Sequence, residues 1–165
     1  MTLSMKEIRA EVLESGGKTP LLRVKELGER FPESIALRNK EFGIWNEISY
    51  LEFWNRSTYL ASALMFYGVK KGEKVAVHSE NRPEWFISDL GIQSVGAVTV
   101  GLYPTNPKSE VEYLLGHSET VVLFAEDQEQ VDKALAVQEN LPSLKLIVYF
   151  DKKGMYKYDS EYLIS

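Results

Sequence analysis

Hydrophobic and polar positions follow two different patterns between residues 74 and 150. Short runs of consecutive apolar residues alternate with segments whose apolar residues recur every three or four positions. The first pattern is typical of strands buried on both faces, and the second of amphipathic helices. The pattern predicts strands at 74–78, 97–101, 120–125 and 145–150 and helices at 83–95, 107–117 and 128–138. Because the strands start about 23 residues apart, a crossover helix fits between them, and the expected fold is α/β with a doubly wound, mostly parallel sheet (βαβαβαβ).

A β-hairpin and an amphipathic helix are predicted before this sheet. Apolar runs at 35–38 and 44–48 are joined by NKEFG, whose Gly43 can supply a positive φ. Ser49 and Glu52 form a Ser-x-x-Glu capping box that starts the helix, and Gly68 ends it. The apolar face of this helix is predicted to carry Leu51, Trp54, Thr58, Ala61, Leu64 and Met65.

These elements divide the chain into four predicted segments. They are an amino-terminal helical or extended segment (1–34), the hairpin with the capped helix (35–72), the parallel α/β subdomain (73–150) and a tail (151–165). Residues 35–150 are expected to pack as one domain. In the tail, Asp159 or Ser160 could cap a helix from Glu161 to Ile164. A finish one turn into a helix leaves two alternatives open: a frayed tail, or a cut inside a longer protein.

Composition narrows the class of partner and compartment. The 24 acidic and 19 basic residues give a net charge of −5 without a basic cluster, which argues against a nucleic-acid partner. Cysteine is absent, which excludes disulfides and thiol catalysis. No run reaches the roughly 20 apolar residues of a transmembrane segment. The expected localisation is therefore cytoplasmic. Met5, Ile8 and Val12 share one helical face, which leaves peripheral membrane contact open.

Signatures of familiar nucleotide sites and catalytic triads are missing. The first predicted strand of the sheet ends in HSENRPEW, and neither a Rossmann fingerprint nor a Walker A loop follows any strand. The acids Glu80, Glu126 and Asp127 are too few for a receiver-type metal cluster and suit helix N-termini. No nucleophile elbow accompanies His78 or His117, and both histidines are interpreted as structural. The sequence thus predicts no catalytic and no metal-binding residue.

An ordered series of motifs resembles the amino-terminal region of AMP-forming acyl-CoA synthetases, and most of all the long-chain fatty-acid–CoA ligases. The resemblance runs from about Leu37 to Phe150. No single motif is decisive, but their order and spacing together are specific. The motifs are GV (68–69), GEKVAV (72–77), NRPEW (81–85), GAV (96–98), LYPT (102–105), YLL (113–115) and SE (118–119).

The resemblance implies an acid–thiol ligase that uses ATP, magnesium and coenzyme A. Such enzymes convert a fatty acid and ATP into an acyl-adenylate and pyrophosphate, and then transfer the acyl group to the thiol of coenzyme A. The phosphate loop of the family, roughly T-S-G-T-T-G-x-P-K-G, has no counterpart here. This favours the second alternative for the tail: an amino-terminal piece of a longer ligase, inactive alone, whose partner is the rest of its own chain.

The alternative is a free-standing α/β binding or interaction module without enzymatic activity. The sequence leaves open the length of the acid, whether it is aliphatic or aryl, whether a carrier protein replaces coenzyme A, and the oligomeric state, a homodimer included.

One loop carries the only site residues that the resemblance implies. In ligases of this superfamily the loop after the equivalent strand lines the channel for the pantetheine arm of coenzyme A, and here that loop is Tyr103, Pro104 and Thr105. Asn106 is predicted to cap the next helix, with Pro107 as its first residue. The competing interpretation is a stiff turn and cap. No contact to the phosphates of coenzyme A is expected, because the region after the next strand reads EDQEQ.

Overall fold

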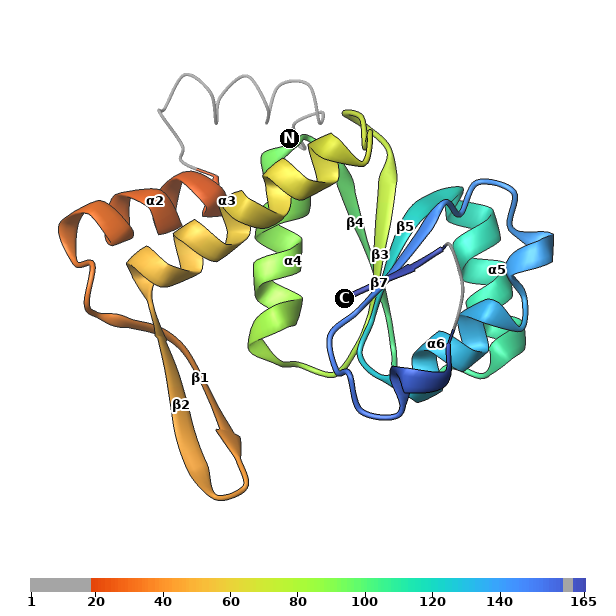
Figure 1. The fold of residues 1–165 in the computed structure, drawn as a ribbon. Coiled ribbons are helices and arrows are strands. Elements are labelled where there is room, and N and C mark those ends of the chain that lie inside the picture. Colours follow the sequence, from red (N-terminus) through yellow and green to blue (C-terminus); the bar gives the residue numbers. More distant parts are fainter. Residues whose placement is uncertain (1–18, 159–161) are drawn as a thin grey trace, which may run out of the picture.

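A five-stranded parallel sheet forms the centre of the molecule (Figure 1). The computed structural model describes residues 19–158 and 162–165. Every pairing in this sheet is parallel, which confirms the predicted fold class. In spatial order the strands are β4 (Val98–Leu102), β3 (Lys74–His78), β5 (Thr120–Ala125), β6 (Leu146–Tyr149) and β7 (Leu163–Ile164).

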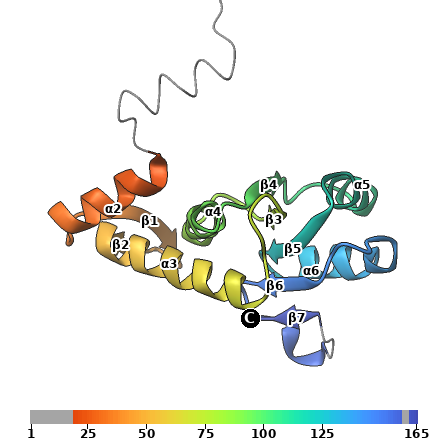
Figure 2. The same cartoon turned by 90° about the horizontal axis from the view of Figure 1, so that it is seen from above.

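Helices cover both faces of this sheet, as Figure 2 shows from above. On one face lie α3 (Tyr50–Phe66) and α4 (Pro83–Ser94), and on the other α5 (Lys108–Ser118) and α6 (Gln128–Leu135). The chain passes from β3 outward to β4 and then returns past β3 to β5 and on to β6. Because the crossovers run in opposite directions before and after β4, α4 lies on one face and α5 and α6 lie on the other. Short 3-10 turns follow at Gln138–Asn140 and Met155–Lys157.

Neighbouring residues along the central strands enter opposite cores. Val77 and Phe124 belong to the core beneath α3 and α4, together with Ile92. Ala76 and Leu123 belong to the core beneath α5 and α6. Because side chains alternate across a strand and both faces are covered, β3 and β5 read as continuous apolar runs rather than alternating ones.

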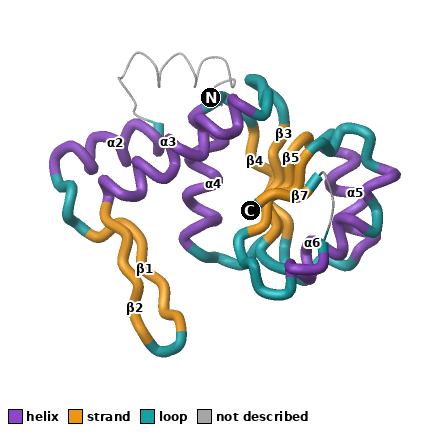
Figure 3. The backbone as a smooth tube through the Cα atoms, in the orientation of Figure 1, coloured by secondary structure: helices purple, strands orange, loops and turns teal. Residues whose placement is uncertain are grey.

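The predicted hairpin is present and projects from the body of the molecule (Figure 3). Its strands β1 (Ile35–Glu41) and β2 (Ile44–Ser49) pair antiparallel. The predicted connection NKEFG is too long, because residues 39–41 belong to β1. Only Phe42 and Gly43 turn the chain, with φ of 47° and 83°. Positive φ at both positions is the geometry of a two-residue type I′ turn, whose twist matches that of the strands.

Both predicted ends of α3 are confirmed. The Ser49 hydroxyl accepts a hydrogen bond of 3.2 Å from the Glu52 amide. At the other end Gly68 has a φ of 81° and donates to the carbonyl of Met65, while Val69 donates to the carbonyl of Leu64. These two bonds form a Schellman motif. A further helix, α2 (Pro20–Arg30), precedes the hairpin and is capped by the hydroxyl of Thr19.

The buried face of α3 is rotated from the predicted one. Met65, predicted on that face, is exposed. The prediction followed the largest apolar residues, whereas the observed face includes small ones because α3 packs closely against α4. The residues buried on α3 are Phe53, Ser57, Ala61 and Leu64.

Four further predictions need correction or fall outside the described residues. Leu163–Ile164, predicted as part of a helix, form a strand that pairs with β6. The backbone of β6 satisfies its hydrogen bonds there, which local sequence patterns do not reveal. The predicted caps Asp159 and Ser160, and the proposed surface face of residues 5–12, lie outside the described residues. The predicted helix 128–138 ends at Leu135. The predicted division at residues 34, 72 and 150 stays a prediction.

No helix in the described part of the chain combines the length and apolarity that a bilayer crossing requires.

Candidate functional site

Three loops follow the carboxyl ends of the parallel strands and lie together at the lower edge of the sheet in Figure 1. From β3 the chain adds β4 on one side, and it then adds β5 on the other side of β3. The position between β3 and β5 is therefore a topological switch point, and open α/β sheets bind ligands at the carboxyl ends of the strands there. The loops start at Ser79 after β3, at Tyr103 after β4 and at Glu126 after β5.

The loop after β4 is a tight turn, called the 103–106 turn below. The amide of Asn106 donates to the carbonyl of Tyr103 at 2.9 Å, and Pro104 occupies the second position, where its fixed φ suits a β-turn. The Tyr103 side chain is 78% exposed, and Thr105 is also exposed. The turn therefore presents an aromatic ring and a hydroxyl outward from a rigid backbone.

The predicted cap of the following helix is wrong. The N-terminal cap of α5 is Pro107, and the helix starts at Lys108. The amide side chain of Asn106 instead donates to the carboxylate of Glu110, one turn into the helix. A proline at the cap position cannot offer a side-chain acceptor, so α5 starts without a side-chain cap to its backbone.

A cleft of about 260 Å³ lies beside the turn. Gly101 forms part of its floor, since a Cβ there would stand 3.6 Å from the ring of Trp85. Trp85 lines the cleft from the first turn of α4, and the other lining residues come from the loop after β3 and the end of β4: Ser79, Asn81, Leu102 and Tyr103. The cleft joins apolar surface to a few polar groups, as small-molecule sites commonly do.

His78 connects the end of β3 to the turn. Its Nε2 lies 3.1 Å from the carbonyl oxygen of Tyr103. The pKa of His78 is lowered from 6.5 to about 4, mainly by burial and secondly by the positive charge of Lys133. The imidazole is therefore neutral at neutral pH. A carbonyl only accepts, so Nε2 carries the proton and donates it. The predicted structural role of His78 is therefore to hold the backbone of the 103–106 turn.

Removing His78 is expected to flatten the acid side of the stability curve. Between pH 4 and 6.5 the histidine is protonated in the unfolded chain but neutral in the folded chain. The free energy of unfolding therefore falls as the pH drops. The slope from this group approaches about 1.4 kcal/mol per pH unit. Urea unfolding of wild type and His78→Leu at several pH values measures the difference. Above about pH 7 the difference should be constant; equal slopes at acid pH would contradict the account.

The acids at this edge have structural partners. Glu126 accepts from the Ser79 hydroxyl at 3.1 Å and from the Glu80 amide at 2.6 Å, and pairs with Arg82. Asp127 caps α6 through the Glu129 amide. This arrangement agrees with the interpretation of these acids as loop and helix-terminal charges. Among residues 19–158 and 162–165 no group of three potential ligands is placed to hold a metal ion.

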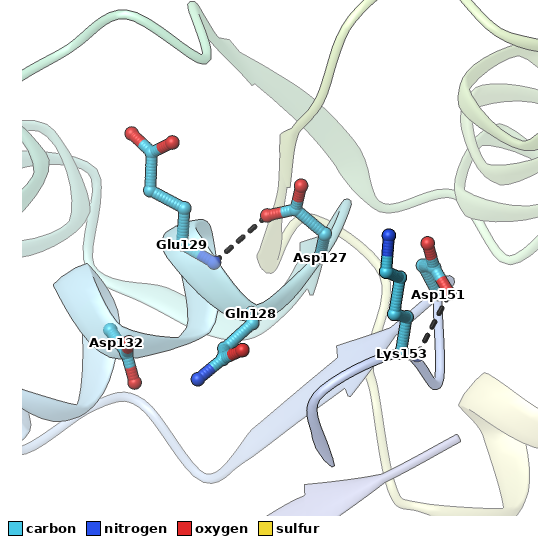
Figure 4. A pocket seen from close by; sticks show the side chains of 6 residues that line it. All are labelled: Asp127, Gln128, Glu129, Asp132, Asp151 and Lys153. Carbon is cyan, nitrogen blue, oxygen red and sulfur yellow. Dashed lines mark hydrogen bonds between the residues drawn. The ribbon is translucent and has the colours of Figure 1, made fainter.

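A second hollow, shown in Figure 4, is strongly acidic. It has a volume of about 470 Å³ and lies between the start of α6 and the segment after β6. Four carboxylates and one amine line it, so it does not offer the charge that phosphate groups require. Its residues are Asp127, Gln128, Glu129, Asp132, Asp151 and Lys153.

Comparison with models of protein families shows to which family this chain belongs. Residues 24–163 match the family described as AMP-binding enzyme. The chain belongs to the AMP-binding enzyme family. The resemblance predicted from the sequence motifs is therefore confirmed, and the match covers the hairpin as well as the sheet.

Curated relatives in this family are long-chain-fatty-acid–CoA ligases. FadD15 of Mycobacterium bovis is 32% identical over 123 residues, which are 74% of this chain and 20% of the relative. Heimdall of Drosophila melanogaster is 33% identical over 104 residues, 63% of this chain and 15% of the relative. The chain therefore spans about a fifth or less of the length of these relatives.

Solved structures show the same fold. The anthranilate CoA ligase AuaEII, solved with anthranoyl-AMP, is 28% identical with a TM-score of 0.68, over 77% of this chain and 24% of its own. Acetoacetyl-CoA synthetase from Streptomyces lividans has a TM-score of 0.77 at 20% identity, over 87% of this chain and 23% of its own. The second similarity supports the fold alone. Both structures thus contain a region with the fold of this chain.

Proposed function

We propose that this chain works as part of an ATP-dependent, AMP-forming long-chain fatty acyl-CoA ligase. The observation that carries the proposal is the family match over residues 24–163, together with relatives named as long-chain-fatty-acid–CoA ligases. The reaction would first join a fatty acid to AMP with release of pyrophosphate, and then pass the acyl group to the thiol of coenzyme A.

These 165 residues alone are proposed to be inactive. The described residues hold no metal-ligand group, and the sequence has no Ser/Thr/Gly-rich phosphate loop with a lysine. ATP and magnesium would therefore be bound by parts of the ligase that lie outside this chain. Those parts are proposed to be its principal partner.

The proposed contribution of this chain to the site is a wall of the coenzyme A channel at Tyr103, Pro104 and Thr105. Support comes from the exposed Tyr103 ring, the rigid turn that carries it and the adjacent cleft. An aromatic face with a hydroxyl suits the mixed apolar and amide character of a pantetheine arm. No contact to the phosphates of coenzyme A is proposed, because four carboxylates and one amine line the hollow near α6.

Replacing Tyr103 with alanine in the full-length ligase is expected to raise the KM for coenzyme A about tenfold, the loss of one well-packed aromatic contact. Fatty-acid-dependent pyrophosphate exchange, which does not involve coenzyme A, should change less than about twofold. Tyr113→Ala is the matched control, because Tyr113 is 65% exposed and does not line the cleft. An unchanged KM in Tyr103→Ala would remove the channel role.

A further inference from the structure

Side chains from two other elements hold the backbone of the 103–106 turn from its inner side. His78 at the end of β3 donates to the carbonyl of Tyr103 at 3.1 Å. Lys133 on α6 donates to the next carbonyl, that of Pro104, at 2.8 Å. Gln130, also on α6, lies 3.5 Å from the same oxygen. Two consecutive carbonyls are thus fixed to β3 and α6.

The Lys133 bond is the strongest of these contacts. Its donor carries a charge, and hydrogen bonds from charged donors are shorter and stronger than neutral ones. The Lys133 side chain is only 17% exposed, so water competes weakly for the carbonyl. Its ammonium group also pairs with the exposed Glu129 at 2.7 Å, one turn earlier on α6. Lys133 therefore has one partner on its own helix and one on the turn.

These bonds determine which side of the turn faces outward. Both carbonyls are occupied on the inner side, while the Tyr103 ring remains 78% exposed beside the cleft. Without Lys133, the carbonyl of Pro104 would keep only the 3.5 Å contact to Gln130, and the turn could rotate. The conformation of the outer surface thus depends on residues that do not form it.

We propose that Lys133 and His78 are positioning residues for thioester formation. They hold the 103–106 turn in the conformation in which its outer face meets coenzyme A. The proposal rests on the proposed function of that turn. Neither residue would contact coenzyme A or take part in adenylate formation, so their loss should affect one half-reaction and spare the other.

The test uses the full-length ligase with Lys133→Met, which keeps an unbranched side chain of similar length and removes the charged donor. We expect the KM for coenzyme A to rise about tenfold, as for loss of one charged hydrogen bond. Pyrophosphate exchange should stay within about twofold of wild type. Lys133→Arg, which restores a donor, should recover most of the affinity. Glu129→Gln is the matched control, because it removes the negative charge that pairs with Lys133 and leaves the Pro104 bond. His78→Leu should raise the same KM.

The outcomes separate this proposal from the proposed function. If Tyr103→Ala raises the KM for coenzyme A and Lys133→Met does not, the channel role stands and the positioning role is overturned. Equal losses of exchange and thioester formation in Lys133→Met would also overturn it, because they indicate a general structural role. If neither variant changes the KM while the ligase is active, the channel role itself fails. A selective rise of KM that Lys133→Arg reverses supports the proposal.

Discussion

Replacing Phe124 with alanine is expected to lower the free energy of unfolding of the 165-residue chain by about 3 to 5 kcal/mol. Phe124 lies on β5, between β3 and β6, and is 1% exposed. Its ring stacks on Phe150 with centroids 5.9 Å apart and fills the core beneath α3 and α4. Truncation removes buried apolar surface and leaves a cavity that the surrounding strands cannot fill. Such a loss is a large part of the stability of a small domain.

Urea unfolding of wild type and variant measures this loss. Phe66→Ala is the matched control, since the Phe66 side chain is 84% exposed in this chain. That substitution should change the free energy of unfolding by less than about 0.5 kcal/mol. A loss below about 1 kcal/mol in Phe124→Ala would contradict the close packing of this ring in the core beneath α3 and α4.

Replacing Gly91 with leucine is expected to lower the free energy of unfolding by about 2 to 3 kcal/mol. Gly91 lies where α4 crosses α3. A Cβ at this position would stand 2.7 Å from Cδ2 of Leu60 and 3.0 Å from the carbonyl oxygen of Ser57. The side-chain atom could move, but the backbone oxygen belongs to α3, so the two helices would have to separate. That separation would disturb the core beneath them.

A glycine in another helix provides the control for this substitution. A Cβ at Gly116 of α5 would meet only Cδ2 of Leu141, at an ordinary 3.5 Å. Gly116→Ala should therefore raise the free energy of unfolding by up to about 1 kcal/mol through helix propensity. Equal effects at both positions would show that the α3–α4 crossing is not close-packed.

Much of the fold could be predicted because most of its helices and strands have patterns that are visible within a short segment of sequence. Strands covered on both faces must be apolar throughout, so β3 and β5 stand out in the sequence. The cap at Ser49 and the Schellman glycine at Gly68 depend only on residues within a few positions of each other. The fold class follows from the even spacing of such elements.

The errors arise where distant residues decide the structure. The strand at Leu163–Ile164 exists because β6 offers a free edge, which no local pattern records. The hairpin turn requires a positive φ at Phe42, a conformation that its side chain gives no reason to expect. The buried face of α3 follows from the close approach of α4, since Ser57 and Gly91 meet there.

The candidate site was only half accessible to sequence reasoning. The resemblance to ligases selected Tyr103, Pro104 and Thr105, but His78 and Lys133 lie 25 and 29 residues from the carbonyls that they hold. One signal was present for His78, a polar residue at the end of an otherwise apolar buried strand. No signal marked Lys133, because a lysine paired with a glutamate four positions earlier resembles an ordinary surface helix pair.

The central claim is most directly tested by assaying the full-length protein for thioester formation from a long-chain fatty acid, ATP and coenzyme A. The account predicts a fatty acyl-CoA, AMP and pyrophosphate as products, with pyrophosphate exchange that needs the acid but not coenzyme A. It also predicts that the 165 residues alone catalyse neither step. Exchange by the 165 residues alone, or a full-length protein that forms no adenylate with any fatty or aryl acid, would contradict the account.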